Sequence, residues 1–172
     1  MSLKNRKIAL FVADLYNEFE FWYPYYRMKE EGADVVVIGP DTVEYKSKLG
    51  IPVKPDSGIA SVKAQDFHAL IIPGGYAPDY MRRNKKMIDF VKEMYQQGKV
   101  IAAICHAGWM LASANIITGK KVTSFVSIKD DMINAGAQWI DDEVVVDGMI
   151  ITSRQPSDLP AFCKTIIRLL TK

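Results

Sequence analysis

The sequence has few of the residues that form disulfides or bind metals, since only two cysteines and two histidines occur among its 172 residues. Two cysteines do not suggest a disulfide framework. Long apolar runs are also missing. The first apolar stretch, Ile8 to Ala13, has six residues, whereas a signal peptide has a longer apolar core and a transmembrane helix needs about 20. We therefore expect a cytoplasmic protein and interpret this stretch as a strand.

Charge of one sign is not in excess. Lysine and arginine number 22 and aspartate and glutamate 20, so the net charge is +2, and no basic run favours nucleic acid or a membrane as partner. The glycine-rich phosphate loops of nucleotide-binding proteins are absent. Asp130 and Asp131 lack the spacing of a metal site and are interpreted as a solvated helix start. We expect no cofactor and no metal.

What the chain does contain is an alternation of strand-like and helix-like segments. Its length fits one buried core, so we expect a single domain over residues 1–172. The expected strands are Lys7–Ala13, Asp34–Ile38, Ala69–Ile72, Val100–Ile104 and Lys121–Ser124, with hairpins around Gly50 and between Glu143–Val146 and Met149–Thr152; the expected helices are Phe19–Glu31, Lys86–Gln97, His106–Ala114, Ser127–Ala135 and Leu159–Leu170. This order predicts an α/β fold whose mainly parallel sheet has helices on both faces.

Cys105 follows the apolar strand Val100–Ile104 directly and precedes a helical pattern. A thiol on such a turn lies at the positive end of the helix, which favours the thiolate, so we expect a lowered pKa. In parallel sheets the active crevice lies outside the carboxyl ends of the strands. Residues 14–20, Gly74-Gly75 and Cys105 all follow strands and are expected at that edge. Cys163 has the helical spacing of a core residue instead.

Two side chains could carry protons for Cys105. His68 precedes a strand and is expected at the opposite end of the sheet, so either His106 is the base or no histidine is. Adjacent side chains normally point apart, and only a strained turn would bring His106 beside the sulfur. A protonated Glu20 could donate to the thiolate, while Glu18 is interpreted as a solvated helix start.

An oxyanion formed by thiolate attack requires fixed N–H donors. The N–H of His106 and the Gly74-Gly75 turn are the candidates, since glycine lets backbone approach a substrate closely. Three tyrosines at positions 23, 25 and 26 are interpreted as packing residues or an interface patch.

Several motifs together resemble the PfpI family of intracellular cysteine hydrolases, within the ThiJ/PfpI superfamily. They are Asn17-Glu18-Phe19-Glu20, Leu70-Ile71-Ile72-Pro73-Gly74-Gly75-Tyr76-Ala77-Pro78-Asp79, Ala103-Ile104-Cys105-His106, Ile128-Lys129-Asp130-Asp131-Met132 and Thr152-Ser153-Arg154-Gln155-Pro156-Ser157-Asp158-Leu159. The resemblance covers nearly the whole chain. It implies a flavodoxin-like three-layer sandwich that forms homodimers and often larger assemblies.

The resemblance also implies roles for single residues. Cys105 matches the family nucleophile, His106 its histidine, and Glu20 the glutamate that hydrogen-bonds the sulfur. Asp79, expected in a loop after Pro78, matches an acid that orients the histidine of a neighbouring subunit. Tyr76 and Phe125 are expected to line the substrate site.

Three positions depart from the family pattern. Ala107 stands where the family usually has glycine, and Asp79 is shorter than the glutamate of some members. Phe125 stands where some members have a tyrosine, so a hydroxyl role would be absent or would move to Ser124 or Ser127.

Family activities include peptidase, glyoxalase-type hydration of α-oxoaldehydes and removal of early glycation adducts. We therefore expect a cysteine-dependent hydrolase or lyase acting on small carbonyl, glycated or peptide substrates. The alternative is a stress-response redox sensor or chaperone whose Cys105 is oxidised without turnover. A glutaminase-type domain conflicts with the histidine count, and a DNA-binding regulator would need an appended helix-turn-helix.

Overall fold

A central sheet carries the fold of residues 2–171, which the computed structural model describes. Its seven strands are β1 Lys7–Phe11, β2 Asp34–Gly39, β5 Ser57–Gly58, β6 Ala69–Ile72, β7 Val100–Ile104, β10 Val144–Asp147 and β11 Ile150–Ser153. They lie in the order β10-β11-β7-β6-β1-β2-β5, and all neighbours are parallel except the β10–β11 hairpin. The predicted α/β class and mainly parallel sheet are confirmed.

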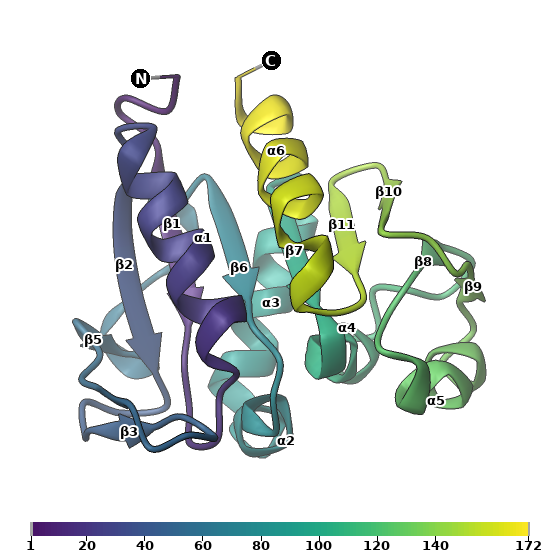
Figure 1. Ribbon diagram of the computed structural model, residues 1–172, viewed down its shortest axis with the longest axis horizontal. Coiled ribbons are helices and arrows are strands. Elements are labelled where there is room, and N and C mark those ends of the chain that lie inside the picture. The colour runs from purple at the N-terminus through teal and green to yellow at the C-terminus, as the bar shows by residue number, and fades with distance from the viewer. Residues whose placement is uncertain (1, 172) are drawn as a thin grey trace.

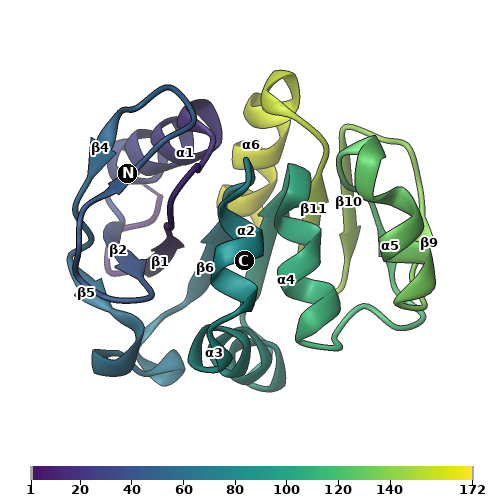
Figure 2. The ribbon, with the colours of Figure 1, turned by 90° about the horizontal axis from the view of Figure 1, so that it is seen from below.

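Helices cover both faces of this sheet. They are α1 Glu18–Glu30, α2 Ala77–Arg82, α3 Lys85–Gln96, α4 Gly108–Ser113, α5 Lys129–Asn134 and α6 Leu159–Leu170. α1 and α6 pack side by side on one face, with α3 and α4 on the other (Figure 1). Figure 2 looks onto the carboxyl ends of the parallel strands, with the two layers of helices above and below. The strands β6 and β7 are buried along their whole length, as expected for a sheet covered on both faces.

Short elements are where the prediction and the structure differ. The hairpin around Gly50 is confirmed as β3 Tyr45–Lys46 and β4 Pro52–Val53. The strand expected at Lys121–Ser124 does not join the main sheet; its first two residues form β8 Lys121–Val122, which pairs with β9 Gln138–Trp139 in a separate small sheet.

The start of α1 is fixed by Asn17, whose side chain accepts hydrogen bonds from the N–H groups of Phe19 and Glu20. Pro24 is the seventh residue of this helix. Since proline has no N–H, the Glu20 carbonyl has no donor at the position that normally closes this turn. No helix within residues 2–171 has both the length and the apolar character needed to cross a membrane.

Candidate active site

Cys105 lies on the turn after β7, at the carboxyl edge of the sheet. Its backbone φ is +62°, a conformation that costs a non-glycine residue about 1–3 kcal/mol and is concentrated at functional sites. The side chain is nearly buried, with 8% of the residue exposed. A 3-10 turn, Cys105–Ala107, separates the thiol from α4, which begins at Gly108. The predicted strand–turn–helix presentation is confirmed, with this extra turn inserted.

The strained turn brings the imidazole of His106 beside the sulfur. His106 Nδ1 lies 3.2 Å from Cys105 Sγ, and its Nε2 lies 3.0 Å from Ser127 Oγ. Burial lowers the pKa of His106, and the positive charge of Lys48 lowers it further. The imidazole is therefore neutral at neutral pH and can accept a proton from the thiol.

Glu20 is the buried acid of the site. It has 0% exposed surface, and the N–H of Gly74 donates to its Oε2 at 2.7 Å. The other oxygen, Oε1, is buried and accepts no hydrogen bond from residues 2–171. Burial raises the pKa of Glu20 to about 7, although the hydrogen bond from Gly74 and the nearby thiol of Cys105 oppose the rise. A large share of Glu20 is thus protonated at neutral pH.

The Gly74-Gly75 turn lets these groups converge. A Cβ on Gly74 would lie 2.6 Å from Glu20 Oε2 and 2.7 Å from Cys105 Cβ, so a larger residue would separate the acid from the thiol. Gly75 has φ +75°, and a Cβ there would lie 2.4 Å from the carbonyl oxygen of Leu15. Both glycines are required by close backbone approach.

The electrostatics of the thiol correct one prediction. Burial raises the pKa of Cys105 to about 12, and the charge of an ionised Glu20 adds to the rise. Hydrogen bonds from the N–H groups of Gly75 and His106 act in the opposite direction. The lowered pKa expected from the helix start is wrong, because the first α-helical residue after Cys105 is Gly108 and burial outweighs the remaining dipole.

The contacts of the backbone N–H groups show which of the candidate oxyanion donors face the sulfur. The N–H groups of Gly75 and His106 point at the sulfur, so these two predicted donors lie where an oxyanion on a bound substrate would form. Gly74 does not join them, because its N–H is occupied by Glu20. The prediction of Gly74 as an oxyanion donor is therefore wrong, and its place is in the support of the acid.

The β3–β4 hairpin borders the site through Glu18. This residue is buried, and its Oε1 accepts a 2.6 Å hydrogen bond from the N–H of Leu49. Burial alone would raise its pKa, but hydrogen bonds from Ser47 and the backbone outweigh burial and lower it. The interpretation of Glu18 as a solvated helix start is thus wrong.

Lys48 belongs to the same hairpin and was not predicted as a site residue. The backbone N–H of Lys48 donates to the carbonyl of Tyr16. Tyr16 in turn forms isolated β-bridges with Ser47 of the hairpin and with Gly75 of the active-site turn. From there the charge of Lys48 lowers the pKa values of both Glu20 and His106, although burial is the largest influence on each. No local pattern in the sequence signals this placement, since it depends on how the hairpin folds back.

Aromatic rings form the wall around His106. Phe125 stacks on the imidazole at 5.4 Å between centroids and 25° between planes, and Trp109 meets it edge-on at 5.1 Å. The N–H of Phe125 also donates to the carbonyl of Cys105 at 3.2 Å. Since Phe125 has no hydroxyl, the hydroxyl that contacts the imidazole is that of Ser127.

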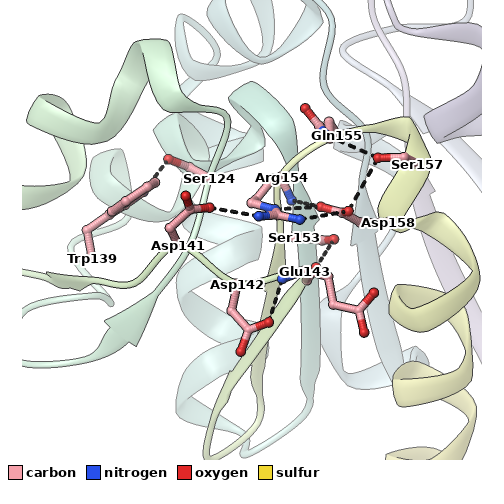
Figure 3. A network of polar contacts seen from close by, with 10 residues as sticks. All are labelled: Ser124, Trp139, Asp141, Asp142, Glu143, Ser153, Arg154, Gln155, Ser157 and Asp158. Atoms are coloured by element: carbon pink, nitrogen blue, oxygen red, sulfur yellow. Dashed lines mark hydrogen bonds and ion pairs between the residues drawn. The ribbon is translucent and has the colours of Figure 1, made fainter.

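A network of polar contacts includes Ser124, the residue before Phe125 (Figure 3). Ser124 accepts a hydrogen bond from Trp139 Nε1 at 3.0 Å, which links the residue before Phe125 to β9. Asp141, which follows β9, pairs with Arg154 at 2.8 Å, and Arg154 is held in turn by Asp158 through Nε and Nη2. Asp141 and Arg154 line one cavity together with Ser124 and Phe125, so the motif after β11 lies beside the active-site wall.

Asp79 and Tyr76 lie on the rim. Asp79 is in the first turn of α2, not in the expected loop, and it forms an ion pair with Arg83, the residue that follows this helix. Within residues 2–171 no hydrogen bond joins Asp79 to His106, so an orienting role for it requires a second subunit. Tyr76 is 45% exposed and packs edge-on against Tyr80.

Other candidate residues lie away from the thiol. Cys163 is buried, as predicted, and burial raises its pKa to about 12. His68 is exposed at the opposite edge of the sheet, where its Nδ1 accepts from the N–H of Lys7. Asp131 accepts from Trp109 Nε1. Across the described residues, no group of three or more histidine, cysteine, aspartate or glutamate side chains could hold a metal ion.

Comparison with known proteins supports the resemblance found in the sequence. Residues 6–169 match the model of the DJ-1/PfpI family. Deglycase PfpI of Pyrococcus furiosus is 42% identical over 164 residues, which cover 95% of this chain and 99% of that protein. Putative cysteine protease YraA of Bacillus subtilis is 40% identical over 167 residues, 96% of this chain and 99% of that protein. The crystal structure of Drosophila melanogaster DJ-1beta matches with a TM-score of 0.91 and 30% identity, covering 97% of this chain and 91% of that one.

Proposed function

The chain belongs to the DJ-1/PfpI family, and we propose that within it this protein is a cysteine-dependent hydrolase or lyase of the deglycase and glyoxalase kind. Small aldehydes and early glycation adducts are the proposed substrates, with peptides as a further class. The observation that carries the proposal is the convergence on one sulfur of a neutral imidazole at 3.2 Å, a buried carboxyl group and two backbone N–H groups.

In the proposed reaction, His106 Nδ1 takes the proton of the Cys105 thiol, and the thiolate adds to the carbonyl carbon of the substrate. The carbonyl oxygen becomes an oxyanion, which receives hydrogen bonds from the N–H groups of Gly75 and His106. Glu20 in its protonated form donates from Oε1 and stabilises the thiolate. Protonation of Glu20 also removes the repulsion that its ionised form would exert on the thiolate.

The imidazolium that forms in this step needs a partner of opposite charge. In residues 2–171 the Nε2 of His106 contacts the hydroxyl of Ser127, which carries no charge. We propose that Asp79 from a second copy of the chain supplies the carboxylate, so that the working enzyme is a homodimer or a larger homo-oligomer.

Steady turnover of methylglyoxal tests the assignment of the nucleophile. Replacing Cys105→Ala should lower kcat/KM at least about 10³-fold, because the covalent step is removed. Cys163→Ala is the matched control, since it removes the only other thiol, and should keep activity within about twofold. Circular dichroism of both variants checks that they fold. Equal turnover by wild type and Cys105→Ala would overturn the proposal.

The competing redox-sensor function predicts a different result in the same assay. Wild-type protein would then show no sustained turnover of aldehydes, glycated amino acids or peptides. It would instead consume about one equivalent of peroxide per Cys105 if the thiol stops at the sulfenic acid, or about two if it reaches the sulfinic acid.

A further inference from the structure

A cavity lies at the opposite edge of the sheet from Cys105. It opens at the amino ends of β1, β6 and β7, near the end of α6 in the upper part of Figure 1. Its volume is about 310 Å³, at the small end of the range of roughly 300–1,000 Å³ found for ligand pockets. Apolar side chains of Phe67, Met149 and Leu169 form part of its lining.

Three basic side chains also line the cavity, namely Arg6, His68 and Lys99. The guanidinium of Arg6 makes no ion pair or hydrogen bond with the described residues, so its fork of donors is available. The Nδ1 of His68 accepts the N–H of Lys7, which leaves Nε2 as the nitrogen that carries a proton. Among residues 2–171, no acidic side chain lines the cavity.

Lys99 is held in place by the main chain. Its Nζ donates to the carbonyl of Ala64 at 2.7 Å, and burial lowers its pKa although the charge of Asp66 opposes the shift. Because the hydrogen-bond partner of the Lys99 ammonium is an uncharged carbonyl group, that bond leaves the positive charge able to attract an anionic ligand. An anion in the cavity would compensate the burial of this group and the unpaired charge of Arg6 together.

We propose that this cavity binds a small organic carboxylate with an apolar body. The carboxylate would take a two-pronged hydrogen bond from the Arg6 guanidinium, with His68 and Lys99 as further donors. The apolar body would lie against Phe67, Met149 and Leu169. Because the site is separated from Cys105 by the length of the strands, its ligand would be distinct from the substrate of the thiol.

Isothermal titration calorimetry with octanoate at physiological salt tests this site. Wild-type protein should bind one octanoate per chain, and Arg6→Gln should weaken binding at least about tenfold, the expected loss of a charge-assisted hydrogen bond. Lys4→Gln is the matched control. Lys4 lies two residues before Arg6 and carries the same charge, but its side chain does not line the cavity, so its removal should leave the Kd unchanged. Octanol and inorganic phosphate, which lack the charge or the apolar body, should each bind at least about tenfold more weakly.

The two histidines give an independent readout by NMR. Octanoate should shift the imidazole signals of His68 and leave those of His106 in place, and Cys105→Ala should bind octanoate as wild type does. The proposal is overturned if octanoate does not bind, if Arg6→Gln binds it as tightly as wild type, if octanol or phosphate binds equally well, or if the ligand shifts His106 and requires Cys105.

Discussion

Glu20 is an ionisable side chain with no exposed surface, and the folded protein therefore holds its proton more tightly than the unfolded chain does. Its pKa is raised from 4.5 to about 7, chiefly by burial. Between these pH values the folded state keeps the proton and the unfolded state has lost it, so stability falls as pH rises. The total effect is about 3 kcal/mol. We expect Glu20→Gln to remove this loss, so that its free energy of unfolding in urea improves on wild type more at pH 8 than at pH 5.

Glu18 provides the control for this measurement, because it lies on the same helix and has a pKa that is lowered, not raised. Its contribution to stability is present above the unfolded pKa and is lost as pH falls. Both pH 5 and pH 8 lie above the unfolded pKa of 4.5, so Glu18→Gln should destabilise the protein by nearly the same amount at the two pH values. If Glu20→Gln also changes stability equally at pH 5 and pH 8, Glu20 does not titrate in the way that its burial indicates.

The thiol and its histidine were predictable from the sequence, because a strand that ends at Cys105 and a count of two histidines leave few arrangements. The different roles of the N–H groups of Gly74 and Gly75 could not be predicted from the sequence. The two residues share one local pattern, and only the long-range contact with Glu20 decides which N–H remains for a substrate. The prediction of a lowered pKa for Cys105 was wrong for the same reason, because burial depends on the whole folded molecule and not on the turn alone.

The polar network beside the active-site wall connects separate secondary-structure elements, because Arg154 joins the start of α6 to the segment after β9 (Figure 3). Arg154 meets Asp158, whose side chain is 5% exposed, and Asp141, whose side chain is 67% exposed. Replacing Arg154→Met would leave the Asp158 carboxylate buried without its cation, a change that costs about 3 kcal/mol. We expect that loss in urea unfolding, together with a lower kcat as the wall at Phe125 loosens.

The other ion pair of Arg154 is the matched control. Asp141→Asn removes the exposed partner and leaves Asp158 paired, so it should cost about 1 kcal/mol or less. If Asp141→Asn costs as much as Arg154→Met, the buried pair is not what holds these elements together.

Elements that bury a continuous apolar face were predicted within a residue or two, as α6 and β7 illustrate. Short elements carry too few residues to show a period, which is why β5, β9 and α2 were missed. The misplacement of Lys121–Ser124 has a related cause. Its apolar residues fit a buried strand, but the sheet edge beside β11 is already taken by β10 of the hairpin.

At the scale of the whole molecule, the open question is whether one chain contains a complete active site. We expect Asp79→Asn and Cys105→Ala chains to be nearly inactive when each is assayed alone. Refolded together, half of the dimers formed by random pairing are mixed, and each mixed dimer has one intact site of two. Activity toward methylglyoxal should therefore recover to about a quarter of the wild-type value.

The ion pair between Asp79 and Arg83 supplies the control for this experiment, because Asp79→Asn also breaks that pair. Arg83→Gln breaks the same exposed contact, which is worth about 1 kcal/mol or less, but leaves the carboxylate available to a neighbour. It should keep most of the activity, while Asp79→Asn should not. If the acid instead served the histidine of its own chain, the mixed dimers would contain no intact site and mixing would restore nothing. A dilute wild-type monomer with full activity would equally rule out a site that depends on two chains.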